Sequence, residues 1–341
     1  MMNTLPVFES LMAGKDLSDE DMRAMLFACM QGTLSDAEVA AFLALLRMKG
    51  ESVSELVSAA RVLEELAQHV SLGERLVDIV GTGGDGKNTF NISTVSSFVA
   101  AAAGVSVAKH GNRAVSGKSG SADLLTLAGF NLQPDEDTLK ASMRACNIAL
   151  LFAPHYHETL LRVRPVRKAL GFRTFFNLLG PLINPARARL QVVGVCTTSL
   201  QEPIARVLAE LGRERVLVVC SEDGLDEISP CAPTRVVEYA NQRFSHWTLY
   251  PEAFDCRHPS LEPIIVNSPA ESLALANAVL EGCPGPARAA VILNAAAAIY
   301  CATPNLDLKD AIEKAKTAID SGAALACFNM ASTLSHTGSP S

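Results

Sequence analysis

The sequence predicts an α/β protein with a small all-helical N-terminal domain and a larger α/β domain, whose mainly parallel central sheet is flanked by helices. Three observations carry this prediction. Residues 1–72 show only helical patterns, short apolar runs alternate with helical stretches from residue 73 onward, and 49% of the 341 residues are apolar. Short β-branched runs separated by helices are typical of a parallel sheet buried on both faces. A chain of this length also exceeds the usual size of a single hydrophobic core.

Capping signals divide the N-terminal part into helices. Three segments, beginning at Ser18, Ser35 and Ser52, place an acidic residue three positions after a serine, which is the pattern of a capping box. Apolar residues then recur at helical spacing, for example at Val39 and Phe42. We therefore expect a compact helical domain.

Six short apolar runs are the expected strands of the second domain, at residues 76–80, 105–108, 148–152, 190–196, 216–220 and 263–266. Residues 157–187 interrupt the pattern with an arginine-rich helix and a loop, and we expect them to pack back on the N-terminal helices and form a hinge with them. The α/β domain then comprises residues 73–156 and 188–334, and residues 335–341 form a frayed tail.

The overall charge and the cysteines exclude some classes of protein. A formal net charge of −7 argues against a protein whose overall field holds it to nucleic acid or to an anionic membrane, but not against a local basic site. No apolar stretch is long enough to span a bilayer, and the first residues show no signal-peptide pattern. The nine cysteines are scattered without a CxxC pair, which favours reduced thiols in the cytoplasm.

A glycine-rich turn at residues 81–86 follows the first expected strand and leads to a helix start. Glycines let the backbone approach a ligand, and the free N–H groups of a helix start favour an anion. The spacing matches neither a dinucleotide fingerprint nor a P-loop, so a tight turn and a phosphate site stay equally open on this feature alone. Asn91, Ser93 and Thr94 can cap the helix, but they can also bind a diphosphate and complete a magnesium shell.

A second polar loop, residues 109–123, follows the next expected strand and contains three cations, three serines and three glycines. These residue types at the carboxyl end of a strand are suited to bind a polyanion, and ligands of open α/β sheets gather at that edge. A solvated loop has the same composition. We favour the binding site because two such loops follow successive strands.

Charged residues form two further candidates. A basic cluster contains Arg162, Arg164, Arg167, Lys168 and Arg173. Helical spacing lets one face of it meet a carboxylate, although a solvated face explains most of these residues.

The second charged candidate is the pair Asp226 and Glu227, which follows the strand at 216–220. Two carboxylates there are suited to hold magnesium against phosphates, with an acidic turn without function as the alternative. His155 and His157 lack a third ligand nearby, so we do not expect them to bind a metal.

Together these segments resemble the anthranilate phosphoribosyltransferase family. The matching strings are GTGGDG…TFNIST at 81–94, KHGNRAVS at 109–116, SGSAD at 119–123, RPVRKALGFRTFFNLLGPLINPA at 164–186 and DGLDEIS at 223–229. With RMKGES at 47–52, the resemblance runs over nearly the whole chain. It implies transfer of the 5-phosphoribosyl group from phosphoribosyl diphosphate to the amine of anthranilate, with release of diphosphate, in tryptophan biosynthesis. It also implies a Mg²⁺ cofactor and a homodimer joined through the helical domain.

The resemblance implies roles for individual residues. The phosphoribosyl diphosphate site would comprise Gly81, Gly84, Asp85, Thr89, Asn91, Ile92, Ser93, Thr94, Lys109, His110, Gly111, Asn112, Arg113, Ala114, Val115, Ser116, Gly117 and Ser121. The anthranilate site would comprise Gly81, Asn112 and Arg167, with His110, Pro154, His157 and Pro181 shaping the approach to it. Ser93, Asp226 and Glu227 would hold magnesium, and Arg167, Lys109 and Asp85 would be catalytic. The family commonly has a second serine where this chain has Gly117, so we expect one hydroxyl contact fewer.

Two alternative functions stay open at this point. A pyrimidine nucleoside phosphorylase would share the architecture, but the strings KHGNR and NLLGPLINP favour the anthranilate enzyme. A non-catalytic nucleic-acid-binding relative would need an extended basic surface and the loss of the substrate motifs. The net charge of −7 disfavours the surface, and the motifs are intact.

Overall fold

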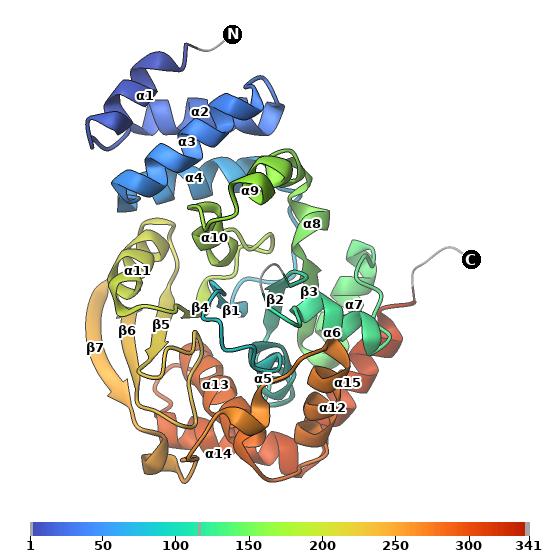
Figure 1. The fold of residues 1–341 in the computed structure, drawn as a ribbon. Coiled ribbons are helices and arrows are strands. Elements are labelled where there is room, and N and C mark those ends of the chain that lie inside the picture. The colour runs from blue at the N-terminus through green and yellow to red at the C-terminus, as the bar shows by residue number, and fades with distance from the viewer. Residues whose placement is uncertain (1–2, 115–116, 338–341) are drawn as a thin grey trace.

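The structure, a computed structural model, describes residues 3–114 and 117–337 of the chain. A group of N-terminal helices lies at one end of the molecule, and a larger α/β part with a central sheet lies at the other (Figure 1). The predicted fold class is therefore confirmed.

The N-terminal group contains the helices α1 (Leu5–Met12), α2 (Asp19–Gln31), α3 (Asp36–Lys49) and α4 (Val53–Leu66). Ser35 and Ser52 each form a full capping box with the glutamate three positions later, as the sequence predicts. Ser18 accepts the N–H of Asp21, but the Asp21 carboxylate accepts from the Ser18 hydroxyl and not from its backbone. The capping box that was predicted at Ser18 is thus a simple N-cap.

One sheet of seven strands, in the order β3-β2-β1-β4-β5-β6-β7, forms the centre of the α/β part. The strands are β1 (Val77–Gly81), β2 (Val107–Gly111), β3 (Ile148–Phe152), β4 (Leu190–Gly194), β5 (Arg215–Ser221), β6 (Thr234–Ala240) and β7 (Arg243–Leu249). Neighbours from β3 to β5 pair in parallel, and β6 and β7 add an antiparallel hairpin. The chain leaves β1 toward β2 and β3 on one side and returns to β4 on the other. Open α/β sheets bind ligands at such a reversal of strand order.

The first five predicted strands are confirmed, and the sixth is wrong. Residues 263–266 include the end of a 3₁₀ helix, η5 (Glu262–Ile264), and only Ile265 makes an isolated bridge, to Thr89. The run is apolar because Ile264 and Val266 are buried against helices and not because it belongs to the sheet. The hairpin of β6 and β7 was not predicted.

Helices cover both faces of the sheet. On one face α5 and α13 pack directly on the strands, with α12, α14 and α15 around them, and α6 and α7 lie near the β3 side. The bounds are α5 (Ile92–Ala102), α6 (Ser121–Leu127), α7 (Glu136–Cys146), α12 (Pro269–Leu280), α13 (Pro286–Ala302), α14 (Leu308–Asp320) and α15 (Ala323–Leu334). On the other face α11 (Gln201–Glu210) packs on β5 and β6 and touches α4. Two short 3₁₀ turns, η3 (Thr198–Leu200) and η4 (Pro251–Phe254), complete this part.

The segment 157–187, which we call the hinge segment, returns to the N-terminal helices. With the residues just before it, the segment forms α8 (Ala153–Tyr156), η1 (Glu158–Leu161), α9 (Arg164–Leu170), α10 (Phe176–Leu179) and η2 (Gly180–Leu182). The rings of Phe175 and Phe42 meet edge to face at 5.9 Å, and Val163 and Val166 belong to the same buried cluster as the N-terminal helices. Its action as a hinge and the domain boundaries stay predictions.

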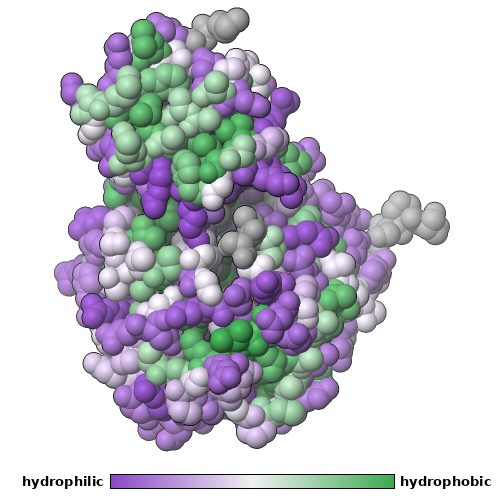
Figure 2. Space-filling model, in the orientation of Figure 1, coloured by the Kyte–Doolittle hydropathy of each residue, from purple (hydrophilic) through white to green (hydrophobic). Residues whose placement is uncertain are grey.

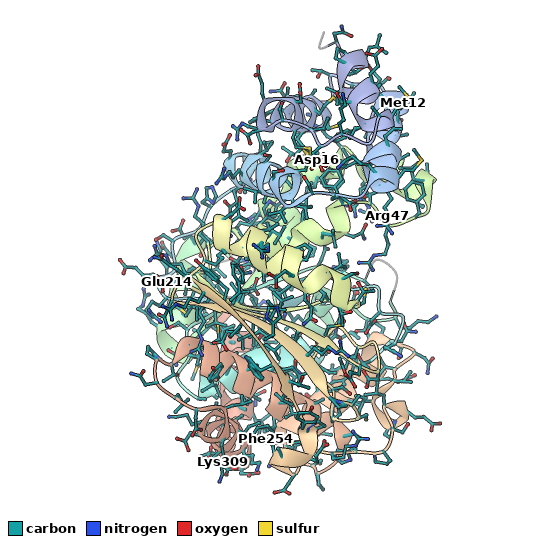
Figure 3. All side chains as sticks on the ribbon, turned by 90° about the vertical axis from the view of Figure 1, so that its left-hand side faces the viewer. Met12, Asp16, Arg47, Glu214, Phe254 and Lys309 are labelled. Atoms are coloured by element: carbon teal, nitrogen blue, oxygen red, sulfur yellow. The ribbon has the colours of Figure 1, made fainter. Side chains whose placement is uncertain are left out.

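The two ends of the molecule can be followed in a second view. Figure 3 turns the β6–β7 hairpin toward the viewer, with Met12 and Asp16 at the helical end and Phe254 and Lys309 at the other. The first residue of the expected frayed tail is bound to the rest of the protein, because Ser335 Oγ accepts from the Asn131 N–H at 3.0 Å. Residues 338–341 of the tail lie outside the described ranges. Among the helices described, none combines the length and the apolar character that a membrane crossing requires.

Candidate active site

Three polar segments meet at the carboxyl ends of β1, β2, β4 and β5. They are the glycine turn (residues 81–86), the loop after β2 and the acidic turn (residues 222–227). Gly81 and Gly194, which end β1 and β4, are partners in the sheet. Figure 2 shows a hollow between the helical part and the α/β part, bordered by hydrophilic side chains. The sheet topology thus brings the predicted motifs to one side of a cleft.

The glycine turn needs its glycines because other chain segments lie against it. A Cβ on Gly81 would lie 2.5 Å from Oδ2 of Asp226, and a Cβ on Gly84 would overlap the guanidinium of Arg173. Gly83 and Gly84 have φ values of 66° and 79°, in the left-handed region that favours glycine. Gly194 has no room for a side chain either, because the backbone carbonyl of Asp226 occupies that space.

The acidic turn presents two carboxylates to the glycine turn and to the start of α5. Asp226 is buried, and its Oδ2 accepts the Gly83 N–H at 2.7 Å. Burial and then the charge of Asp85 raise the pKa of Asp226 to about 7. Oε1 of Glu227 accepts the Ser93 N–H at 2.8 Å, and burial followed by the charge of Asp226 raises the Glu227 pKa well above its usual range. The predicted carboxylates therefore converge.

This convergence fits a divalent cation that is completed by a substrate. In the described ranges no group of three or more His, Cys, Asp and Glu side chains is arranged to hold a metal. Asp226 and Glu227 nevertheless lie close to Asp85, and besides burial the mutual repulsion of these carboxylates helps to raise the pKa values of Asp226 and Glu227, an effect that a bound cation would relieve. Mg²⁺ is commonly held by one or two carboxylates together with substrate phosphates. The donor set of this structure has that composition.

Asn91 does not cap α5, contrary to the simpler reading of the sequence. Its Oδ1 accepts from the hydroxyls of Ser119 and Ser272 at 2.7 and 2.8 Å, and its Nδ2 donates to the Ser119 carbonyl at 3.1 Å. The side chain thus links the helix start to the loop after β2 and to α12. Thr94 Oγ1 is buried without a partner among the described residues, and Ile92 belongs to the core.

Lys109 is buried at the end of β2. Its Nζ donates to the Ile79 carbonyl at 2.6 Å and to Ser93 Oγ at 3.4 Å. Burial lowers the Lys109 pKa, and the charges of Asp78 and Glu227 oppose that shift. The amine therefore lies between the backbone of β1, two residues before the glycine turn, and the start of α5.

Asp78 and Asn184 support this arrangement and were missed by the sequence analysis. Asp78 is fully buried in β1 and accepts from the His110 N–H at 3.1 Å and from Asn184 Nδ2 at 2.8 Å. Burial raises its pKa to about 6. Asp78 could have been found from the sequence, because it is a carboxylate inside an otherwise apolar strand and burial of a carboxylate is costly unless it is paired.

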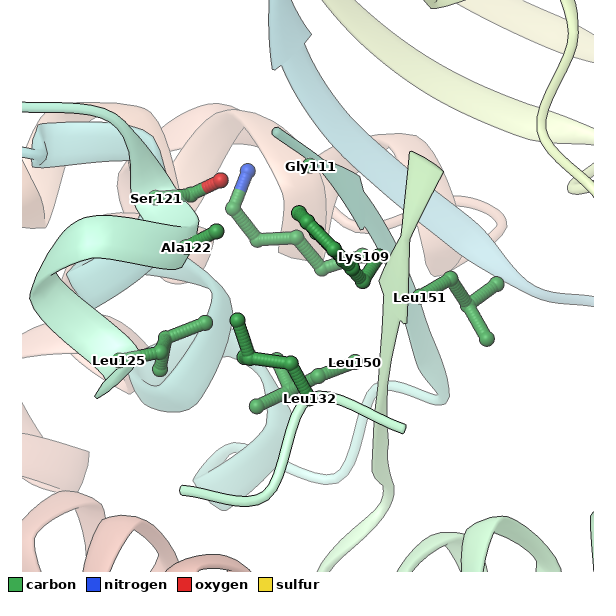
Figure 4. A pocket seen from close by; sticks show the side chains of 9 residues that line it. Lys109, Gly111, Ser121, Ala122, Leu125, Leu132, Leu150 and Leu151 are labelled. Carbon is green, nitrogen blue, oxygen red and sulfur yellow. The ribbon is translucent and has the colours of Figure 1, made fainter. Parts of the chain in front are cut away.

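The loop after β2 folds over the start of α6. Gly111 faces the Ser121 hydroxyl too closely for any side chain, and that hydroxyl donates to the Asn112 carbonyl at 3.1 Å. Asp123 accepts from Arg113 at 3.1 Å and from the Ala114 N–H at 2.9 Å. Figure 4 shows Lys109, Gly111 and Ser121 on one side of a pocket whose remaining wall is apolar. The predicted residues Val115 and Ser116 lie outside the described ranges, and Gly117 is exposed.

Arg167 lies on α9, on the helical side of the cleft. Its guanidinium stacks over the ring of Phe176 at 5.2 Å, and burial lowers its pKa. Within the described ranges it forms no ion pair with a carboxylate of the protein. A half-buried, unpaired cation is suited to bind an external carboxylate.

Two histidines lie near this side of the cleft, with their rings 5.3 Å apart. Nδ1 of His110 lies 3.2 Å from the Gly180 carbonyl, and Nε2 of His157 lies 2.9 Å from the Ile183 carbonyl. Burial lowers their pKa values to about 3 and about 4. Both rings are thus neutral at pH 7. Pro181 is buried and Pro154 is half-buried in α8.

Comparison with known proteins identifies the chain at the level of its family. Residues 5–67 match the "Glycosyl transferase family, helical bundle domain", and residues 73–325 match the "Glycosyl transferase family, a/b domain". The chain is 54% identical to the anthranilate phosphoribosyltransferase of Legionella pneumophila (strain Paris), over 97% of this chain and 96% of that protein.

Solved structures agree with the sequence comparison. The crystal structure of anthranilate phosphoribosyltransferase from Thermus thermophilus is similar with a TM-score of 0.90 and 38% identity, over 96% of this chain and 98% of that one. The enzyme from Saccharomyces cerevisiae, in complex with phosphoribosyl diphosphate and Mg, is similar with a TM-score of 0.89 and 27% identity, over 98% of each chain. The chain therefore belongs to the anthranilate phosphoribosyltransferases of the glycosyl transferase family.

Proposed function

We propose that this protein transfers the 5-phosphoribosyl group from phosphoribosyl diphosphate to the amine of anthranilate in a magnesium-dependent reaction that releases diphosphate. The observation that carries the proposal is the meeting of the glycine turn, the Lys109 loop and the acidic turn, with an unpaired Arg167 on the helical side of the cleft. Similarity to anthranilate phosphoribosyltransferases over nearly the whole chain supports it and favours it over a phosphorylase or a nucleic-acid-binding protein.

The diphosphate would bind at what we call the diphosphate corner, formed by the glycine turn, the N-terminus of α5, Lys109 and the acidic turn. Gly83 and Gly84 expose their backbone, and the first N–H groups of α5 add a positive end of the helix dipole. Lys109 contributes a positive charge beside Ser93. Gly81, Thr89, Asn112 to Gly117 and Ser121 would complete the site around the ribose and its 5-phosphate.

Magnesium would be held by Ser93, Asp226 and Glu227 together with phosphate oxygens. When bound, the ion supplies positive charge that stabilises the departing diphosphate. The Saccharomyces cerevisiae enzyme, whose structure contains phosphoribosyl diphosphate and Mg, supports the use of magnesium. The carboxylates of this chain are held for that task by the N–H groups of Gly83 and Ser93.

Anthranilate would bind at the anthranilate wall, formed by Arg167, Phe176, His110, His157, Pro154 and Pro181. Arg167 would pair with the carboxylate, and Asn112 and Gly81 would meet the molecule on the opposite side. The neutral rings of His110 and His157 leave this wall free of competing charge. The wall would therefore aim the amine at C1 of the ribose.

The chemistry requires charge stabilisation more than proton transfer. The bond from C1 to the diphosphate oxygen breaks with its electron pair on the diphosphate, and the nitrogen lone pair forms the new bond to C1. Lys109 and the helix start stabilise the charge that develops on the leaving group. An aryl amine is neutral and nucleophilic at pH 7, and its surplus proton is released to solvent after the bond forms. Closure of the hinge segment would exclude water from the activated sugar.

Three finer properties belong to the same proposal. We propose a homodimer joined through the helical domain, which is supported by Leu5, Met12 and Met48, exposed by 58%, 59% and 76% on α1 and α3. We propose a domain division between residues 72 and 73, which lies between the two family matches. Cytoplasmic location is proposed from the scattered cysteines, each of which is free.

A fluorescence assay that follows the loss of anthranilate tests the function directly. We expect anthranilate to be consumed only when phosphoribosyl diphosphate and magnesium are both present. Phosphorolysis of thymidine or uridine without turnover of anthranilate would replace the proposal with a phosphorylase. Turnover of neither, together with a salt-dependent shift of DNA in a gel, would favour the nucleic-acid-binding alternative.

A further inference from the structure

Arg173 reaches from the hinge segment across to the glycine turn. It lies between α9 and α10, and its guanidinium donates to the carbonyl of Thr82 at 3.1 Å. The same guanidinium fills the space that a side chain on Gly84 would occupy. No other hydrogen bond found in the described residues joins the hinge segment to the turn. The contact joins parts of the chain that we assign to the two different substrates.

The peptide between Thr82 and Gly83 is held from both of its sides. Its carbonyl accepts from Arg173, and its N–H donates to Oδ2 of Asp226 at 2.7 Å. The preceding N–H, that of Thr82, donates to the Gly194 carbonyl at 2.9 Å. Three separate segments thus determine the orientation of this one turn.

The turn needs such support because its own backbone does not determine its shape. Gly83 and Gly84 both have positive φ, and glycine populates several backbone regions at similar energy. Without a donor on the Thr82 carbonyl, rotation of the peptide plane would move the Gly83 N–H away from Asp226. Asp226 would then lose the backbone donor that orients its carboxylate.

We propose that Arg173 is a positioning residue that fixes the Thr82–Gly83 peptide and thereby presents Asp226 and the glycine turn to magnesium and diphosphate. This inference rests on the proposed function and adds a residue for which the sequence motifs gave no role. Arginine suits the task because its planar guanidinium can lie flat on a glycine while it donates to a carbonyl. The residue also makes the diphosphate corner dependent on the hinge segment.

The substitution Arg173→Gln tests the proposal. We expect the KM for phosphoribosyl diphosphate and the magnesium concentration for half-maximal rate each to rise about tenfold, because a charge-assisted hydrogen bond is lost. The KM for anthranilate should change less than about twofold. Calorimetric titration with phosphoribosyl diphosphate and magnesium, without anthranilate, should show about tenfold weaker binding. Arg173→Lys, which keeps the charge and one donor, should recover part of each loss.

Arg162→Gln is the matched control. Arg162 belongs to the same segment, and its guanidinium also lies against a glycine, with Nη1 2.9 Å from the Cβ position of Gly32 in the helical part. This contact is remote from the diphosphate corner, so binding and kinetics should match those of the parent chain.

Two results would overturn the proposal. Unchanged sugar-diphosphate binding in a variant with a lower melting temperature would make Arg173 a purely structural contact, and a selective rise in the KM for anthranilate would assign it to the other substrate. Should the glutamine variant not fold, the same measurements on Arg173→Lys decide. Measurements on the parent chain separate a failure of the proposed function from a failure of the positioning role. Turnover by the parent chain tests the proposed function, and the ratio of variant to parent binding tests the role of Arg173.

Discussion

The diphosphate corner and the anthranilate wall face the same cleft, yet the chain builds them differently. In the corner, backbone N–H groups of Gly83 and Ser93 hold Asp226 and Glu227, so several segments share the support of each charge. In the wall, Arg167 lies over the ring of Phe176 and has no carboxylate partner in the described residues. Changes in the corner should therefore affect the whole reaction, and changes in the wall should affect one substrate.

The largest effect should follow from neutralising the corner. We expect Asp226→Asn combined with Glu227→Gln to lower kcat/KM by on the order of 100-fold or more, because the charges that would hold magnesium at the leaving group are lost. Steady-state rates measured against magnesium concentration check this. Glu214→Gln is the control, since Glu214 pairs with Arg75 at 3.2 Å and with Arg189 at 2.8 Å just before β5, at the opposite end of that strand from the acidic turn. An unchanged magnesium dependence in the double variant would remove both carboxylates from the metal site.

Truncation of the wall tests the other half of the comparison. Arg167→Ala should raise the KM for anthranilate about 10- to 100-fold, which corresponds to the loss of one charge-assisted pair, and should leave the KM for phosphoribosyl diphosphate nearly unchanged. Lys168→Ala, an exposed neighbour on the same helix, should behave like the parent. Equal effects on the KM values of both substrates would contradict the separation of the anthranilate wall from the diphosphate corner.

The neutral histidines of the wall should appear in the pH dependence of stability. Burial lowers the pKa of His157 to about 4, and it faces His110, with a pKa of about 3, and His69. Because the folded pKa lies below the unfolded one, the stabilising contribution is full above pH 6.5 and is lost as the pH falls toward 4.

The corresponding variant is His157→Gln. Between pH 7 and pH 5 its unfolding free energy should fall by about 1–2 kcal/mol less than that of the parent. Urea unfolding at the two pH values measures this, with His258→Gln as the control, because the His258 side chain has no ion pair among the described residues. An equal fall in parent and variant would show that His157 is already charged in the folded protein.

The smallest effect concerns Gly117, at the position where the resemblance led us to expect a second serine. The position is exposed, and a Cβ there would find its nearest neighbour, Oδ1 of Asn88, at 3.9 Å. Gly117→Ser should lower the KM for phosphoribosyl diphosphate by a few-fold, about the contribution of one hydrogen bond. Steady-state kinetics at saturating anthranilate measure this change. A higher KM would mean that the glycine is needed for the shape of the loop.

The parts of this protein whose structure depends only on residues that are neighbours in the sequence could be predicted from local patterns. The parallel strands were predictable because each contains a short, mainly apolar run, and Gly81 and Gly84 were expected because a turn that approaches a ligand needs glycine. The hairpin of β6 and β7 was missed because half-exposed strands such as Arg243–Leu249 mix polar and apolar residues. Residues 263–266 were misassigned because a short apolar run does not distinguish a buried strand from a buried turn.

Contacts between segments that are distant in the sequence limit how much of the candidate site could be predicted. Arg173 and Thr82 are separated by 91 positions, and no pattern at either place indicates the other. Asn91 looked like a helix cap, yet its side chain binds Ser119 and Ser272 instead. The residues of each motif were thus visible in the sequence, whereas the side chains that hold the motifs against one another depend on the completed sheet.

The apolar cluster that joins the N-terminal helices to the sheet also bears on how the chain is synthesised. Leu46 and Leu63 share this cluster with Val166 of the hinge segment and with Val193 and Val218 of the sheet. On the ribosome, α1 to α4 emerge before any of these partners exist. The apolar face of these helices therefore stays exposed to solvent until the hinge segment and β5 have been synthesised. An N-terminal fragment that ends after α4 should accordingly be prone to aggregate, because it contains all four helices but lacks the segments that cover their apolar face.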